Sequence, residues 1–138
     1  MAGLKSLIRL RKHELDEKRQ AVAKFIAMLD NLRREEVRAL NELDAEKKEA
    51  ESNLETRQAF PNYNKRIQAK LKALREEQIK VSRAIEKAQA ELQDSFKEYK
   101  TYEITQRERE RAEAAEEKRV EDQAMDEIGI EGFRRRDK

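Results

Sequence analysis

Apolar residues recur along the second half of the chain at alternating intervals of four and three residues. A repeat of 3.5 residues kept over this distance is typical of the seam of a left-handed coiled coil. Only Gln78 and Ser95 interrupt it. The positions of this stripe are Ile67, Leu71, Leu74, Gln78, Val81, Ile85, Ala88, Leu92, Ser95, Tyr99 and Tyr102.

The first half of the chain repeats the pattern less regularly. Its stripe shifts sideways near Glu36 and becomes sparse after Leu43. The pattern still indicates a helix with one apolar face. The positions of this first stripe are Ile8, Leu15, Val22, Phe25, Ile26, Leu29, Leu32, Val37, Leu40, Leu43, Ala50 and Leu54.

Proline and glycine divide the chain into two long helices. Pro61 is the only proline, and it disfavours helix at Phe60, while the side chain of Asn62 is suited to cap a following helix. Gly129 and Gly132 indicate where the second helix ends. We therefore predict a first helix over about 4–58, a corner at 59–62, a second helix over about 63–128 and a frayed basic tail at 129–138.

Two long helices joined by a short corner cover both stripes only by folding back on each other. The predicted fold class is therefore all-α, a single long two-helix antiparallel coiled-coil hairpin, with arms of roughly 80–100 Å at 1.5 Å per residue. A corner near residue 60 places residue i opposite about residue 120 minus i. The N-terminal arm would then end beside residues near Glu116.

Composition supports an extended helical protein and argues against an enzyme. The chain is 45% charged and 37% hydrophobic, whereas a compact domain is about 25% charged. The charges nearly cancel at +2, which argues against disorder. The longest apolar run is Phe25 to Leu29, so we predict no membrane span and no secretory segment, and a cytoplasmic location.

No catalytic, cofactor-binding or metal-binding residue is predicted. A two-helix coil offers no dry cavity in which reactive groups could be held, and the chain contains no phosphate-binding loop and no metal-ligand motif. His13 is the only histidine, and a solvent-facing position on the helix explains it best. The protein is therefore predicted to act through binding.

Charge patterning makes nucleic acid a weak candidate partner. Most Lys and Arg residues alternate with Glu, as in the run from Arg107 to Arg111, and this cancels the field that a phosphate backbone would meet. Only Arg134 to Arg136 forms an uninterrupted basic run. A short basic tail of this kind is more often a solvated terminus or a contact for another protein.

Two clusters suggest contacts with other proteins. Phe60 and Tyr63 sit at the predicted corner, where they either cover the end of the seam or touch a partner. At the other end, the segment from Leu4 to Leu10 carries more apolar residues than one seam can cover, interleaved with Arg9 and Arg11. Such a tip suits a groove on another protein. A membrane-surface helix is the competing interpretation, weakened by the acidic residues that follow.

The sequence resembles the FliJ family, small coiled-coil components of the bacterial flagellar type III export apparatus. The resemblance extends over nearly the whole chain, and its order along the chain matches that of the family. The segments that carry it are Leu4 to Arg11, Asp16 to Arg19, Phe60 to Tyr63, Phe96 to Glu103 and Met125 to Ile128.

This resemblance implies a non-enzymatic role like that of the central stalk of a rotary ATP synthase. The end that holds both helix termini would enter the pore of a hexameric export ATPase (FliI-like). The rest would reach toward the membrane export gate protein (FlhA-like), with the protein peripherally associated with the inner-membrane export apparatus at the flagellar base. Family members are also implicated in handling export chaperones.

Carried onto this sequence, the resemblance implies two sets of contact residues. The ATPase-binding end would include Leu7, Ile8, Arg11, His13, Arg107, Arg109 and Arg111. The export-gate-facing end would include Leu43, Leu54, Phe60, Tyr63 and Ile67.

The residues leave a second class of function open. A generic coiled-coil adaptor or hairpin chaperone outside the flagellar system would have the same heptads and the same Arg/Glu texture. An adaptor would bind through its flank and tolerate loss of the extreme termini. A prefoldin-like chaperone would need strands beside the hairpin, and the sequence contains no alternating strand pattern.

Overall fold

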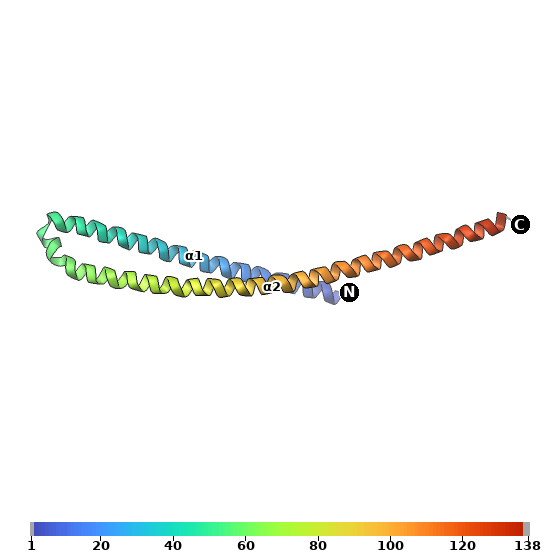
Figure 1. Ribbon diagram of the computed structural model, residues 1–138, viewed down its shortest axis with the longest axis horizontal. Helices are drawn as coiled ribbons and strands as arrows, with labels where there is room; N and C mark the ends of the chain where they lie inside the picture. Colours follow the sequence, from blue (N-terminus) through green and yellow to red (C-terminus); the bar gives the residue numbers. More distant parts are fainter. Residues whose placement is uncertain (1, 137–138) are drawn as a thin grey trace. The chain divides into compact units, whose positions relative to one another are not determined.

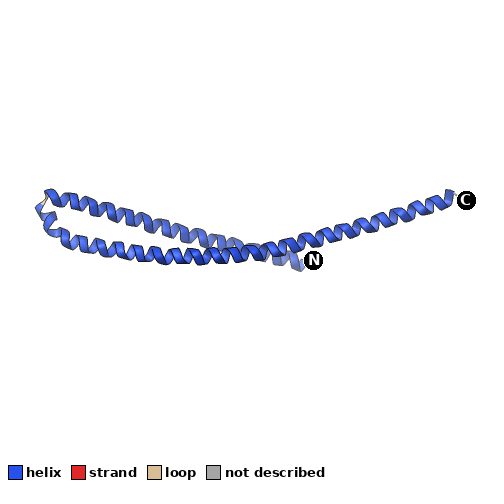
Figure 2. Ribbon diagram, viewed as in Figure 1, coloured by secondary structure: helices blue, strands red, loops and turns tan. Residues whose placement is uncertain are grey.

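The computed structural model describes residues 2–136, and two helices account for all of them except Asn53. Helix α1 spans Ala2–Ser52 and helix α2 spans Leu54–Arg136 (Figures 1 and 2). The described residues contain no strand. The predicted all-α, two-helix fold is confirmed. The chain divides into two compact units, which are described separately below.

The first unit, named here the corner unit, comprises Glu14–Ser95. Within it α1 and the first half of α2 run antiparallel, side by side (Figure 1). Its core is a cluster of Ala39 and Leu43 from α1 with Ile67 and Leu71 from α2, and Leu71 is only 1% exposed. The chain thus covers its apolar seam by folding back on itself.

The stripe predicted for α2 is confirmed throughout. Every one of its positions from Ile67 to Tyr102 is buried or half-buried, including the polar Gln78 and Ser95. The stripe predicted for α1 is partly wrong. Ile26, Val37 and Leu40 are exposed, because the real seam passes through Glu36 and Ala39 instead.

Glu36 explains the apparent sideways shift of the first stripe. Its Oε2 accepts hydrogen bonds from Gln78 Nε2 at 3.2 Å and from Arg75 Nε at 3.3 Å. Glu36, which interrupts the stripe of α1, therefore faces Gln78, which interrupts the stripe of α2. A polar pair within an apolar seam fixes the register, because sliding either helix would bring a polar group against apolar side chains.

The corner lies earlier in the chain than the sequence predicted. Asn53 alone separates the helices and caps α2, since its Oδ1 accepts a hydrogen bond from the Thr56 N–H at 3.2 Å. Arg57 closes α1 by donating to two carbonyl oxygens at its end, from Nε to Ala50 at 3.0 Å and from Nη2 to Glu51 at 2.8 Å.

The predicted corner at 59–62 is therefore wrong. The prediction that the first helix extends to residue 58 is also wrong, because α1 ends at Ser52. Pro61 lies inside α2, as its eighth residue, and Asn62 does not begin the helix. Proline removes the hydrogen bond that its nitrogen would donate to the Arg57 carbonyl, which permits a bend without ending the helix. The register moves accordingly, so that Glu36 faces Gln78 and not a residue near 84.

The second unit, named here the terminal unit, comprises Met1–His13 and Phe96–Lys138. Arg11 joins its two segments through an ion pair with Glu98, with Nη2 and Oε1 3.2 Å apart. Further toward the N-terminus, Leu4 and Lys5 border a shallow hollow with Gln106 and Arg109. The N-terminal arm thus ends beside residues 106–113 and not near Glu116.

Helix α2 continues through the segment that was predicted to fray. Gly129 and Gly132 both keep negative φ angles, so neither adopts the left-handed conformation with which glycine commonly ends a helix. The predicted tail is therefore helical to Arg136, and residues 137 and 138 lie outside the described residues. From residue 107 to residue 136 every side chain is exposed.

The location of the corner predicts the effects of two asparagine substitutions on stability. Asn53→Ala removes the cap of α2 and should lower the free energy of unfolding by about 1 kcal/mol, measured by urea denaturation. Asn62→Ala is the matched control, because Asn62 is exposed inside α2, and it should leave stability unchanged or slightly raised. The opposite order of the two effects would contradict a corner at Asn53.

Candidate functional site

The described residues offer exposed surfaces for binding. Among them no group of three or more His, Asp or Glu residues could hold a metal ion. Neither helix, over the described chain, contains a stretch long and apolar enough to cross a membrane. The residues of interest are therefore those exposed in each unit.

Leu7, Ile8 and Arg11 of the predicted ATPase-binding set have a structural role in the terminal unit. Leu7 and Ile8 are half-buried. Arg11 is also half-buried, and besides its ion pair with Glu98 its guanidinium lies 5.7 Å from the ring centroid of Tyr102. This distance fits a cation–π contact. These side chains hold the N-terminal segment against α2, which leaves only part of each available to a partner.

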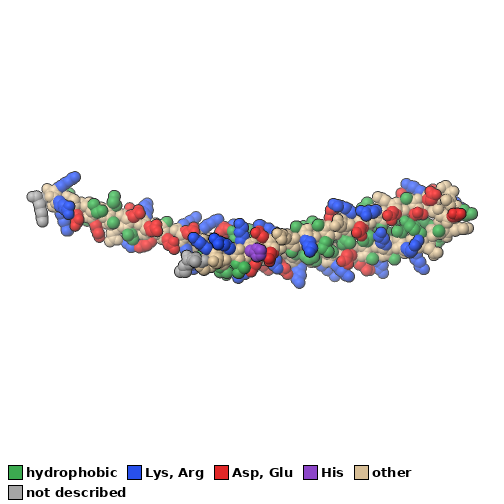
Figure 3. Space-filling view, turned by 180° about the vertical axis from the view of Figure 1, so that it is seen from behind, with side chains coloured by type: hydrophobic (Ala, Val, Ile, Leu, Met, Phe, Trp, Pro, Cys, Tyr) green, Lys and Arg blue, Asp and Glu red, His purple; other side chains and the backbone are tan. Residues whose placement is uncertain are grey.

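The remaining members of this set are exposed. His13 is solvent-facing, as predicted, and Figure 3 shows it at the surface. Arg109 and Arg111 are exposed on α2, and Arg109 borders the shallow hollow beside Leu4. Arg107 is exposed but its Nη2 lies 2.7 Å from Glu103 Oε1. The terminal unit thus contains all seven residues of the set, with His13, Arg109 and Arg111 the most accessible.

Glu103 is the centre of a small polar network in the terminal unit. A hydrogen bond from Tyr99 is the main cause that lowers the pKa of its carboxyl, followed by the hydrogen bond from Lys100. Lys100 Nζ also lies 5.7 Å from the ring centroid of Phe96. The segment Phe96 to Glu103, on which the family resemblance rests in part, is thus held together by its own side chains.

The predicted gate-facing set divides into buried and accessible residues. Leu43 and Ile67 belong to the core cluster, with 6% and 7% of their surface exposed, so in the folded hairpin they pack and do not present a contact surface. Leu54 is 63% exposed at the first position of α2. Phe60 and Tyr63 are half-buried against the core cluster.

Phe60 and Tyr63 cover the end of the seam next to the corner. Their ring centroids are 6.4 Å apart, with the planes tilted by 39°. Partial burial, together with the carboxylates of Glu46 and Glu42, raises the pKa of the Tyr63 hydroxyl. The prediction that these aromatics cover the end of the seam is therefore confirmed, and both side chains remain partly exposed.

Sequence reasoning missed two exposed apolar surfaces. On the flank of the corner unit, Val37 and Leu40 lie one turn apart with 56% and 41% of their surface exposed. They were assigned to the seam because the interruption at Glu36 hid the true register. Near the end of α2, Met125, Ile128 and Phe133 are exposed where a frayed tail was expected. The available signal was the return of large apolar residues at 125, 128, 130 and 133 after a stretch of charged ones.

Acidic and basic side chains lie close to one another on the surface. Figure 3 shows acidic and basic side chains intermingled on the visible face. Exposed ion pairs one helical turn apart recur in both units, for example Asp30 with Arg34, and Glu116 with Arg119. Because each such pair contributes only about 0–1 kcal/mol, they support helix and solubility more than they fix any partner.

Comparison with known proteins gives one match. The family model described as flagellar FliJ protein matches residues 1–138. No curated protein and no solved structure shows a significant match.

The polar network around Glu103 predicts a specific change on removal of one hydroxyl group. Tyr99→Phe keeps the ring in place but removes the main hydrogen bond to Glu103, so the pKa of that carboxyl should rise toward its ordinary value, measured by carbon NMR titration. Glu116 is the internal control, because Arg119 lowers its pKa independently of Tyr99. A pKa of Glu103 that does not move would contradict the network.

The same pKa shift gives a sign for the dependence of stability on pH. Because the pKa of Glu103 is lowered by folding, its contribution is fully present above the unfolded pKa and is lost as the pH falls through the folded value. Tyr99→Phe should therefore lower the free energy of unfolding most at neutral pH, and its difference from the wild type should shrink as the pH falls through the folded pKa of Glu103, measured by urea denaturation at several pH values.

Proposed function

We propose, from the premise that the chain belongs to the flagellar FliJ family, that it acts as a central-stalk-like link between the hexameric export ATPase and the membrane export gate. The coarser part of this statement follows from the family itself: the protein is a non-catalytic component of flagellar protein export. The link between the ATPase and the gate is our proposal, and the accessible residues of each unit support it.

The observation that carries the proposal is the family match over residues 1–138, on a chain built from helices of 51 and 83 residues. Backbone hydrogen bonds make a helix stiff along its axis, and the paired seam of the corner unit adds side-chain packing to that stiffness. A coil of this kind transmits a push or a rotation without offering any reactive site.

The ATPase is the proposed partner of the terminal unit. The exposed residues His13, Arg109 and Arg111 have acidic neighbours there, which allows several weak contacts without a single locked orientation. Leu7, Ile8 and Arg11 are half-buried and would support this surface, while Arg107 is exposed within it and already paired with Glu103.

The export gate is the proposed partner of the corner. Leu54, Phe60 and Tyr63 form the accessible part of the expected set, whereas Leu43 and Ile67 act through the core that holds the corner in shape. This arrangement fits a protein that stays in the cytoplasm and associates with the inner-membrane apparatus only through that contact. Export chaperones are further proposed partners, by the family resemblance.

A side-on adaptor is the second candidate function, and one observation favours it. Val37 and Leu40 expose apolar surface on the flank of the corner unit, away from either end of the hairpin. A partner that binds there would not need the termini. Val37→Asp with Leu40→Asp would then abolish binding of the main partner, whereas the stalk proposal expects ATPase binding to survive this double substitution.

Removal of two accessible arginines tests the ATPase-binding end. Arg109→Gln with Arg111→Gln should weaken binding to the export ATPase hexamer about tenfold, because two exposed charge contacts of about 0.7 kcal/mol each are lost. Biolayer interferometry measures the change, and circular dichroism checks that helix content is kept.

The matched control removes the same charge from the same helix. Lys70→Gln with Lys72→Gln changes two exposed residues of the corner unit and should leave ATPase binding unchanged. Equal losses in the two double variants would point to net charge alone and would contradict a specific role of the terminal unit.

Leu54→Asp tests the corner as the gate-facing end. An acidic residue in the first turn is favourable for a helix, so the fold should be kept, while apolar contact with the cytoplasmic part of the gate protein is lost. Binding should weaken by more than about tenfold, as expected for the loss of one well-buried leucine contact. Leu10→Asp, an exposed leucine of the terminal unit, is the control and should leave gate binding intact.

A further inference from the structure

The last turns of α2 carry the most exposed large apolar side chains of the described chain. Met125, Ile128 and Phe133 have 69%, 67% and 68% of their surface exposed. Helical spacing places Met125 and Ile128 one turn apart on one face, while Phe133 lies farther along the helix at the edge of that face, on the side away from Ile128. A helix that exposes such a face in water requires a partner to cover it.

Two glycines lie within this same face. Gly129 is one turn from Met125, and Gly132 is one turn from Ile128. Each costs about 1 kcal/mol in a helix relative to alanine, yet both are helical, and a Cβ added at either would meet nothing within 4 Å. Glycine on an apolar face leaves a notch into which the large side chain of a facing helix fits.

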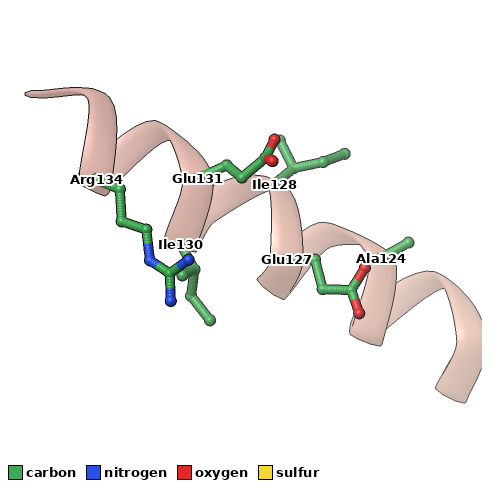
Figure 4. A pocket seen from close by; sticks show the side chains of 6 residues that line it. All are labelled: Ala124, Glu127, Ile128, Ile130, Glu131 and Arg134. Atoms are coloured by element: carbon green, nitrogen blue, oxygen red, sulfur yellow. The ribbon is translucent and has the colours of Figure 1, made fainter.

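The surface around the glycines is hollowed accordingly. One shallow hollow passes over Gly129 between Met125 and Phe133. A neighbouring hollow on the same segment is bordered by the six residues drawn in Figure 4, in which Ile128 and Ile130 lie on opposite sides of the helix and Glu127, Glu131 and Arg134 lie between them. Large apolar side chains and glycine positions that leave space for a facing side chain therefore occur on the same segment.

The charges beside this face have a direction. Glu121 and Asp122 precede the apolar centre, and Arg135 and Arg136 follow it. Two copies of the segment in parallel would place acid beside acid and base beside base. Two copies in antiparallel orientation place the acidic end of each copy against the basic end of the other, which favours that orientation over a parallel pair in register.

We infer that residues 121–136 form a self-association site whose occupant is the same segment of a second copy of this chain, paired antiparallel about a two-fold axis near Ile128 and Gly129. The interface is isologous, so each notch receives a knob from the other copy. The facing pairs are Met125 with Gly132, Ile128 with Gly129, Glu121 with Arg136 and Asp122 with Arg135.

A second copy suits this face better than a lipid surface does. Glu121, Asp122, Asp126 and Glu127 would meet anionic headgroups with like charge, whereas in the pair the basic end of the partner neutralises the first two. The contact is short, so the association is expected to be weak, with a dissociation constant above about 1 μM. The inference goes beyond the proposed function, because it involves neither the ATPase nor the gate.

Sedimentation equilibrium of the full chain at about 1–300 μM tests self-association. The wild type should dimerise reversibly, and Arg135→Glu with Arg136→Glu should weaken dimerisation at least about tenfold, because acid then faces acid. Glu121→Arg with Asp122→Arg should weaken it equally. Combining all four substitutions restores opposite charges across the pair and should restore the dimer.

Several results would overturn the inference. The inference is wrong if the wild-type chain stays monomeric over the whole concentration range. It is also wrong if both charge-reversed double variants still dimerise, or if the variant with all four substitutions does not regain the dimer. Lys70→Glu with Lys72→Glu is the control for a charge change of the same size outside the site, and an equal loss of dimer there would also overturn it.

Orientation is tested by disulfide cross-linking, since the chain has no cysteine of its own. Gly129→Cys should cross-link to itself near the two-fold axis. Glu121→Cys and Arg136→Cys should each remain monomeric alone and should cross-link when mixed. Cross-linking of Glu121→Cys to itself, without the mixed product, would indicate a parallel pair and contradict the inference. These tests contain no ATPase, so their failure would leave the ATPase-binding experiment unaffected.

Discussion

The register between the two helices of the corner unit is the constraint on which the rest of the hairpin depends. It is fixed where Glu36 accepts hydrogen bonds from Gln78 and Arg75 within an otherwise apolar seam. A slip by one heptad would bring Glu36 against aliphatic side chains and leave the carboxylate without these donors, which is costly for a half-buried charge. The register in turn decides which apolar residues form the core and which remain for partners.

The corner follows from the same constraint. Asn53 and Arg57 satisfy the backbone groups left open where α1 ends and α2 begins, and this sets the length of each arm. Leu43 and Ile67 consequently meet in the core, while Leu54 stays outside it. What a partner can touch at this end is therefore a narrow apolar surface supported by a packed cluster.

Much of this fold could be predicted from the sequence, because heptad spacing and the absence of helix breakers act locally. The stripe from Ile67 to Tyr102 is an example, since every position packs as predicted. The corner could not be predicted from Pro61, because proline in the first turns of a helix permits a bend without a stop. The corner at Asn53 could not be predicted either, because it depends on a cap formed by the asparagine side chain, and asparagine at many other positions forms no such cap. The exposed contact residues could not be predicted without knowing how the two helices align. The apolar stripe of α1 does not reveal that alignment, because it is interrupted at Glu36.

The chain belongs to a family of flagellar export proteins and has accessible charged residues in its terminal unit and an apolar surface at its corner, the two surfaces on which the proposed link rests. The most direct test is cryo-electron microscopy of the full chain bound to the export ATPase hexamer with a nucleotide analogue. The account predicts a two-helix coil in the central pore, built from residues 2–13 and the segment that begins at Phe96. A hexamer with an empty pore and the chain bound along its outer surface would contradict it.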